Sequence, residues 1–441
     1  MTTAVPQNNP RPLVGLYETI SGDEDARVCK DIPESACNAQ PVNFFVHLVS
    51  NTLSKIGDEL ASARLVLAWL LGALGAPAAF AGFLVPIRES GSLMPQLFVA
   101  AAIRRQPVRK WFWVAGSIGQ GIAVMLMAVV ALTLEGAAAG WAILGLLALF
   151  ALSRGVNSVA SKDVLGKTIA KTRRGAVMGY AASAAGFATL ALGLYLTLTD
   201  LEDAGIGVFV ALLAAAAGAW WLSALFFAGL REQPGATEGG GNAVVEALRS
   251  IRLLWQDREF GHFVLTRALL MSTALALPFY VLLAESATSG SFVTLGLLIL
   301  ATGLASALSA PIWGRASDRS SRGVLIASGL IAGALGVGLA MLSWADRAQA
   351  LDGWIYAALF FVLGVSHAGV RLGRKTYLVD MATQETRAAF TAVSNTVIGV
   401  LLLVGGLFGL LAQLAGTEFA ILVLALFSLA GAFSAWRMPE V

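Results

Sequence analysis

Charged side chains lie inside several long apolar stretches of this sequence, where each is a candidate for chemistry. The stretch "NTLSKIGDELASAR" carries both carboxylates and cations, and "GFLVPIRESGSLMPQ" places an arginine beside a glutamate between two prolines. A charge at bilayer depth is costly unless it is paired or faces water, so each marks a candidate functional position. The charged side chains in these stretches are Lys55, Asp58, Glu59, Arg64, Arg88, Glu89, Arg154, Arg267 and Arg371.

The three carboxylates among these side chains, Asp58, Glu59 and Glu89, are the candidates for carrying a proton. Desolvation disfavours an ionised carboxylate and a nearby arginine favours it, so a partner that moves can switch proton affinity. We expect Arg88 to pair with Asp58 or Glu59, and Glu89 to pair with Lys55 or with a polar group across an interface. Lys55 is also within one helical turn of both carboxylates of its own stretch. The alternative is a permanently paired network that only holds helices together.

The elements that position these residues are predicted to be membrane-spanning helices. The chain of 441 residues is 57% hydrophobic and only 13% charged, far from the balance of a soluble domain. A helix needs about 20 apolar residues to cross a hydrocarbon core. We therefore expect an all-α integral membrane protein with twelve transmembrane helices near 43–72, 77–103, 111–134, 140–161, 175–198, 206–230, 260–284, 292–313, 323–344, 354–374, 388–414 and 417–436.

The loops between these spans predict the orientation. Three basic breaks, "RRQPVRK", "KDVLGKTIAKTRR" and "GRASDRSSR", fall on one side, whereas Glu135, Asp200, Glu202 and Asp203 fall on the other. Cytoplasmic loops are enriched in Lys and Arg. Both termini are therefore predicted to be cytoplasmic.

The spans divide into two halves of six. We expect a cytoplasmic tail at 1–42, a first six-helix bundle at 43–230, a cytoplasmic linker at 231–259 and a second bundle at 260–437. In the linker, Val244, Leu248, Ile251 and Trp255 recur at helical spacing, which is typical of an amphipathic helix. The pairs Gly155–Val156 and Gly369–Val370 recur at an offset that relates the halves as a repeat.

The break "WGRASDRSSRG" and this organisation resemble the major facilitator superfamily, over about residues 43–437. The family's signature loop is matched by Gly314, Asp318, Arg319 and Arg322. The resemblance implies two pseudo-symmetric six-helix bundles and a gating role for this loop, whose acid helps to latch the outward-facing state. The equivalent break of the first half has no acid, and we interpret Arg104 to Lys110 as determining topology.

The resemblance also implies which charges face a central cavity. In the family, the first, fourth, seventh and tenth helices line it, and the second lies beside it. On that template the predicted substrate-binding residues carry a surplus of cations, which favours an anionic or zwitterionic solute, because Arg suits carboxylate and phosphate. Arginines that contact helix carbonyls are the alternative. The predicted substrate-binding residues are Lys55, Arg88, Arg154, Arg267, His367 and Arg371.

Motifs for other classes of function are missing. The sequence has no P-loop, no dinucleotide-type glycine turn and no metal-ligand cluster, so we expect neither an enzyme nor a cofactor. Its net charge is only +3, and no nucleic-acid-binding motif accompanies this charge. Its two cysteines, Cys29 and Cys37, lie in the tail and are expected to be free thiols, since the cytoplasm is reducing.

The predicted function is secondary active transport of a small organic, anionic or zwitterionic solute by alternating access, coupled to protons. Symport and antiport are both compatible with the sequence. The expected partners are the solute, the proton and the lipid bilayer, for a monomer in the bacterial inner membrane. The alternatives are an efflux pump for amphipathic compounds, and a sensor or assembly factor that kept the fold without transport.

Overall fold

The computed structural model describes residues 17, 32, 34–93, 99, 102–103, 105–199, 205–235, 251–345, 351–383 and 386–441. Within these ranges the chain forms helices joined by short connections, and no strand occurs among them. Ten helical segments are long and apolar enough to cross a membrane, as an apolar solvent requires of a backbone that must satisfy its own hydrogen bonds. The all-α membrane class is thus confirmed, and the count of twelve stays a prediction.

The helices follow the order of the expected spans. The first half contains α2 (Glu34–Leu60), α3 (Val66–Ala73), α4 (Ala78–Leu93), α6 (Lys110–Thr133), α7 (Gly136–Thr168), α8 (Lys171–Leu198) and α9 (Ile206–Ala228). The second half contains α11 (Leu253–Gln256), α12 (Arg258–Leu270), α13 (Ser272–Leu275), α14 (Leu277–Ala287), α15 (Phe292–Arg319), α16 (Ser321–Trp344), α17 (Gly353–Met381), α18 (Arg387–Gly405), α19 (Phe408–Ala415) and α20 (Thr417–Trp436).

The first expected span differs from the prediction. Its helix begins at Glu34 rather than near residue 43, because a helix that extends beyond the membrane needs no apolar residues there. It then ends at Leu60, and a new helix begins at Val66. The intervening segment Ala61–Leu65 contains neither proline nor glycine, so its sequence gives no conventional signal for the break.

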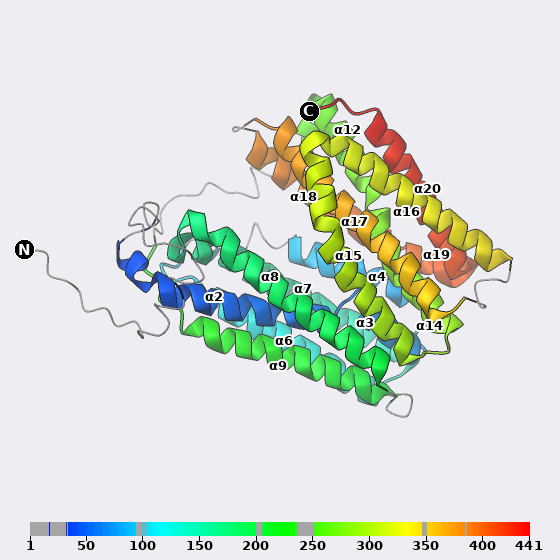
Figure 1. Ribbon diagram of the computed structural model, residues 1–441, viewed down its shortest axis with the longest axis horizontal. Helices are drawn as coiled ribbons and strands as arrows, with labels where there is room; N and C mark the ends of the chain where they lie inside the picture. Colours follow the sequence, from blue (N-terminus) through cyan, green and yellow to red (C-terminus); the bar gives the residue numbers. More distant parts are fainter. Residues whose placement is uncertain are drawn as a thin grey trace, which may run out of the picture.

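Two sets of helices converge at one end of the molecule and diverge at the other (Figure 1). We call the end where α2 begins and α20 ends the near side, which the loop charges predict to be cytoplasmic, and the opposite end the far side. Helices of the two halves meet in related pairs, α8 with α15 and α4 with α18 and α19. If the two halves were exchanged, each pair of helices would take the place of the other. This relation is expected of two bundles that are repeats of one another.

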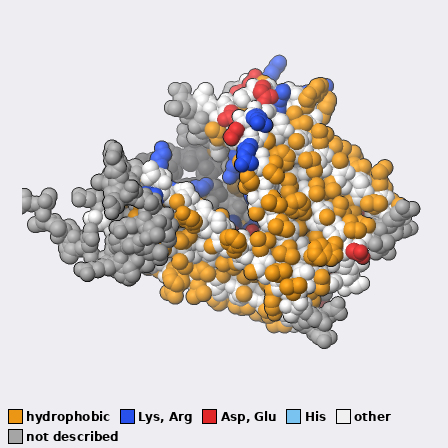
Figure 2. Space-filling model, viewed as in Figure 1, with side chains coloured by type: hydrophobic (Ala, Val, Ile, Leu, Met, Phe, Trp, Pro, Cys, Tyr) orange, Lys and Arg blue, Asp and Glu red, His pale blue; other side chains and the backbone are white. Residues whose placement is uncertain are grey.

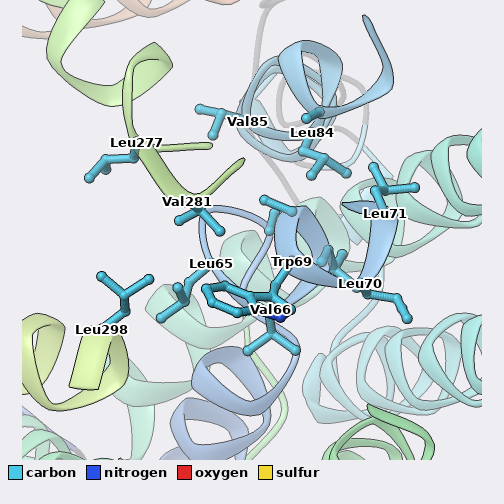
Figure 3. Close-up of a cluster of buried hydrophobic side chains, with 14 of the residues drawn as sticks. Leu65, Val66, Trp69, Leu70, Leu71, Leu84, Val85, Leu277, Val281 and Leu298 are labelled. Atoms are coloured by element: carbon cyan, nitrogen blue, oxygen red, sulfur yellow. The ribbon is translucent and has the colours of Figure 1, made fainter. Parts of the chain in front are cut away.

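The far side is closed by a cluster of buried hydrophobic side chains from both halves (Figure 3). The first half contributes Leu65, Val66 and Trp69, and the second contributes Leu277, Val281 and Leu298, all at most 4% exposed. We call these six residues the far-side gate. Because packed apolar side chains leave no room for water, this end of the molecule is sealed.

Glycines allow helices of the two halves to approach closely beside the far-side gate. A Cβ atom added to Gly82 of α4 would collide with the backbone of Gly409 in α19. On the other flank, a Cβ atom at Gly296 of α15 would lie 2.8 Å from the backbone oxygen of Gly193 in α8. Closure of the far side therefore depends on these positions lacking side chains.

Replacing Gly82 with valine should open the far side. Overpacking a tight contact costs about 1–3 kcal/mol, which changes the ratio of open to closed protein by about fivefold to more than 100-fold. A cysteine introduced at the buried position Val281 should then react faster with a membrane-impermeant maleimide applied from the far side. The matched control is Gly145→Val, where a Cβ meets nothing within 4 Å. Equal labelling of the two variants would contradict this account of the closure.

The tail and the linker are only partly described. The amphipathic helix predicted around Val244 and Leu248 lies mostly outside the described residues, and α11 forms a single turn next to it. Cys37 is disulfide-bonded, so the expectation of a free thiol at this position is wrong. A reducing compartment disfavours disulfides in general, but a fold can still bring two sulfur atoms within bonding distance. Cys29 lies outside the described residues.

Candidate functional site

A cavity of about 580 Å³ lies between the two halves, within the size range of small-molecule sites. Figure 2 shows a hollow between the two sets of helices, with Lys and Arg side chains in and around it, while hydrophobic side chains cover much of the rest of this face. Basic side chains dominate the charged lining. The basic residues that line the cavity are Arg64, Arg88, Arg154, Arg267, Arg371, Arg374 and Lys375, and the acidic ones are Asp58, Glu59 and Glu89.

Asp58 lies between two arginines from different helices. Arg88 of α4 donates to its Oδ1 atom at 3.2 Å, and Arg154 of α7 donates to the same oxygen. The pair of Arg88 and Asp58 confirms the pairing predicted from the sequence. The bond from Arg154 was not predicted, because the sequence does not say how α7 is rotated. One carboxylate thus joins α2, α4 and α7.

Glu89 has a different partner from the one expected. Arg64 donates to its Oε1 atom at 2.9 Å, and Arg88 lies 3.5 Å away. Lys55 forms no ion pair within the described part of the chain and does not line the cavity, so the predicted pair of Glu89 and Lys55 is wrong. The reason is the break after Leu60, which brings Arg64 next to α4.

Glu59 differs from the other two acids of the cavity. Its side chain is exposed and forms no hydrogen bond or ion pair with the described residues. Asp58 and Glu89, in contrast, each accept from arginines. All three proton-coupling candidates therefore line the cavity, and Glu59 is the one open to a new partner. Their roles in coupling stay predictions.

Arg64 also reaches across to the second half. Its Nη1 atom lies 3.1 Å from Nε2 of His367 in α17, and Nδ1 of His367 lies 3.1 Å from the hydroxyl of Thr273 in α13. His367 was predicted to face the cavity and does so. Arg64 belongs to the charged side chains of the apolar stretches, but the predicted site does not include it. Only the three-dimensional structure could identify this role, since the two residues are 303 positions apart.

The second half contributes a group of cations on two helices. Arg267 of α12 donates to Ser394 at 2.5 Å and to Asn395 at 2.8 Å. Arg371 and Arg374 of α17 line the cavity and form no hydrogen bond or ion pair with the described residues. Their spacing of three places them on one face of the helix. This spacing was the signal that could have identified Arg374 and, one position later, Lys375, which the sequence prediction missed.

The predicted gating residues lie at the near-side ends of α15 and α16. Arg322 pairs with Glu440 at 2.7 Å and donates to the carbonyl of Met438. Asp318 and Arg319 are exposed and form no ion pair with the described residues. A Cβ atom at Gly314 would meet nothing within 4 Å. An Asp318 without an ion pair among the described residues agrees with a far side that is closed, and the gating role stays a prediction.

The basic break of the first half does more than determine topology. Arg109 pairs with Asp163 at the end of α7. The fully buried carboxylate of Glu232 accepts from the backbone N–H groups of Arg109 and Lys110 and from Lys167 at 3.0 Å. A carboxylate at a helix N-terminus satisfies free N–H groups and is favoured by the helix dipole. These bonds fasten α6, α7 and the end of α9 into one unit.

Comparison with known proteins identifies related folds. Residues 263–441 match the model of the Major Facilitator Superfamily. The whole chain is similar to a D-xylose–proton symporter, with a TM-score of 0.68 and 12% identity over 90% of this chain and 98% of that one. It is also similar to the nucleoside transporter NupG, with a TM-score of 0.67 and 13% identity over 89% and 99% of the two chains. No curated protein sequence matches this chain.

A third similar structure is a POT family transporter in complex with a thioalcohol-conjugated peptide, with a TM-score of 0.66 and 11% identity over 92% of this chain and 98% of that chain. Identities this low show a common fold and nothing of the solute. The resemblance inferred from the sequence is thereby confirmed.

Proposed function

This chain has the fold of the Major Facilitator Superfamily, and from that premise we propose that it transports a small organic anion by alternating access, coupled to protons. The observation that carries the proposal is the positive charge of Arg371 and Arg374 in the cavity between the halves, with which no acidic side chain of the described residues forms an ion pair. Similar structures include a D-xylose–proton symporter and a nucleoside transporter, and they support transport in general. The class of solute is inferred only from the residues that line the cavity.

The charges of the cavity support an anion over a cation. In the first half, Asp58 and Glu89 are already neutralised by arginines. In the second half, no acidic side chain lines the cavity within the described residues, so Arg371 and Arg374 are not neutralised there. A carboxylate or phosphate group would supply the missing counter-charge and accept paired hydrogen bonds from guanidinium groups.

Alternating access is supported by the two ends of the cavity. The far side is sealed by the far-side gate, whereas Figure 2 shows a hollow between the two sets of helices, and Asp318 forms no ion pair with the described residues. A carrier needs a second state in which these conditions are reversed. Glu59 and the paired carboxylates are the groups through which a proton would be coupled to that exchange.

A second candidate, efflux of amphipathic compounds, is supported by an apolar groove of about 430 Å³. The groove is lined by α12, α13, α18, α19 and α20, and Met271 lines both this groove and the cavity. A lipophilic tail in the groove and an anionic head in the cavity would be adjacent. This candidate differs from the first in requiring an apolar solute.

Thermal unfolding of the purified protein in detergent distinguishes these proposals. A ligand that binds the native state at 100 times its Kd stabilises it by about 2.7 kcal/mol. We expect pools of small carboxylates or organic phosphates to raise the Tm, and pools of small organic cations to leave it unchanged. Stabilisation by fatty acids alone would favour the second candidate. Stabilisation by cations, or by no anion pool, would contradict both.

A further inference from the structure

A hydrogen bond between ionisable side chains joins the two halves at the floor of the cavity. Arg64 lies in the segment between α2 and α3, and His367 lies in the middle of α17, 3.1 Å from the arginine. The nearby bond between halves from Ser90 to the carbonyl of Gly399 cannot change with pH, since neither group titrates. Of these two bonds, only the contact of Arg64 with His367 has a charge state that can be altered.

The hydrogen bonds around His367 define its protonation state. Thr273 donates its single hydroxyl proton to the carbonyl of Leu270 at 2.9 Å, so its oxygen must accept from Nδ1 of His367. The proton of the imidazole is thus on Nδ1. Arginine has only donors, so Nε2 must offer its lone pair to Arg64. The bond between the halves requires a neutral His367.

A proton on Nε2 would reverse this contact. The added N–H would point at a guanidinium N–H only 3.1 Å from the ring nitrogen, so two donors and two positive charges would face each other. Arg64 has an alternative, because its Nη2 atom is already bound to Glu89 in its own half. Thr273 would keep its bond from Nδ1. A proton on Nε2 would therefore break the contact of His367 with Arg64, which joins the halves, and would leave the bond of His367 to Thr273 intact.

The surroundings of His367 determine when such a proton can bind. The charges that act on it are those of Arg64, Arg371 and Arg374, all of them positive. An anion in the cavity would offset them, so anion binding and proton binding favour each other. Other charged residues of the helices packed against α17 lie elsewhere: Glu285 faces Gly72, Arg322 pairs with Glu440, and Arg315, Asp318 and Arg319 occupy the last turns of α15.

Both ends of this contact are attached directly to the far-side gate. Arg64 precedes Leu65 and Val66 in the chain, and Thr273 precedes Leu277 and Val281. A bond that holds Arg64 to His367, and His367 to Thr273, therefore holds the first-half side of the gate against the second-half side. Loss of the bond removes one polar restraint and leaves the closure to apolar packing and to the bond from Ser90 to Gly399.

We propose that Nε2 of His367 is a proton-binding site, and that a proton bound there releases Arg64 and favours opening of the far-side gate. The proton comes from cavity water, since His367 lines the cavity, and occupies the lone pair that Arg64 now uses. This role does not depend on which solute is carried. It adds a histidine of the second half to the carboxylates of the first half as a coupling residue.

The test measures the distance across the gate with and without sulfate, an anion whose charge does not change between pH 8 and pH 5 and which should enlarge the response to pH. Spin labels on cysteines introduced at the exposed positions Ala73 of α3 and Ser286 of α14 report the separation of the halves by pulsed electron resonance, with the native cysteines replaced by serine. Lowering the pH from 8 to 5 should increase a long-distance population in the protein with native His367. The ratio of open to closed should change by at most about tenfold per pH unit, because one proton is bound.

Matched variants identify the titrating group. In His367→Gln, the amide can accept from Arg64 and donate to Thr273 but cannot titrate. The far-side gate of this variant should therefore remain closed at both pH values. Arg64→Gln lacks the restraint and should be more open at pH 8. His262→Gln, which alters a histidine bonded to Ser434 outside the cavity, should keep the native response. An unchanged pH response in His367→Gln, or no response in the native protein, would overturn the proposal.

Discussion

Replacing Asp58 with asparagine should abolish transport and lower the stability of the protein, the largest effect expected of any single substitution in the cavity. Asp58 is the one carboxylate that accepts from both Arg88 and Arg154. Without its charge, two partly buried guanidinium groups face each other across α4 and α7. Breaking a buried ion pair by removal of one partner costs about 3–5 kcal/mol, and the solvent in the cavity reduces that cost here.

The measurements are the Tm of the purified protein and the uptake rate per folded molecule in proteoliposomes. The control is Asp163→Asn, which removes a carboxylate bonded to Arg109 and Lys167 outside the cavity. It should lower the Tm without abolishing uptake. Combining Asp58→Asn with Arg154→Gln should recover part of the lost stability. Native uptake by Asp58→Asn would show that this network is not part of the transport cycle.

The second large effect is expected from Arg371 and Arg374. Changing both to glutamine should lower the affinity for the anion by about 100-fold or more, since a hydrogen bond to a charged group contributes about 1.5–3 kcal/mol. Stability should change little or rise, because the two cations have no counter-charge among the described residues of the second half and repel each other. The opposite signs of the two effects distinguish loss of a ligand from loss of structure.

This prediction is checked by the concentration dependence of anion uptake in proteoliposomes. The matched control is Arg315→Gln, an exposed arginine of α15 that does not line the cavity. It should leave the half-saturating concentration unchanged. A double variant that transports the anion with native affinity would mean that the unpaired charge of α17 serves another purpose.

Features that follow from hydropathy, from depth within a span or from the family resemblance could be predicted from the sequence. The depth of a charge in an apolar span placed Asp58 and Arg88 at matched positions, and the structure pairs them at 3.2 Å. His367 and Arg371 were placed in the cavity through the family resemblance, and both line it. The all-helical membrane fold follows from hydropathy, because the bilayer admits few other structures.

Features that depend on the break within the first span, or on how the two halves pack together, could not be predicted. The break from Ala61 to Leu65 has no proline or glycine, and it determines that Arg64 rather than Lys55 reaches Glu89. The bond from Arg64 to His367 depends on how the two halves are packed, which no local pattern encodes. Arg374, in contrast, was visible in its spacing from Arg371 and was overlooked.

The central claim, transport of an organic anion together with a proton, is tested most directly by flux in proteoliposomes. Labelled carboxylates and organic phosphates would be supplied with and without a pH gradient, and internal pH would be recorded at the same time. We predict saturable movement of an anion, driven by the gradient and accompanied by proton movement, and no movement of matched organic cations. Binding of an anion without any flux, or transport of cations alone, would contradict the account.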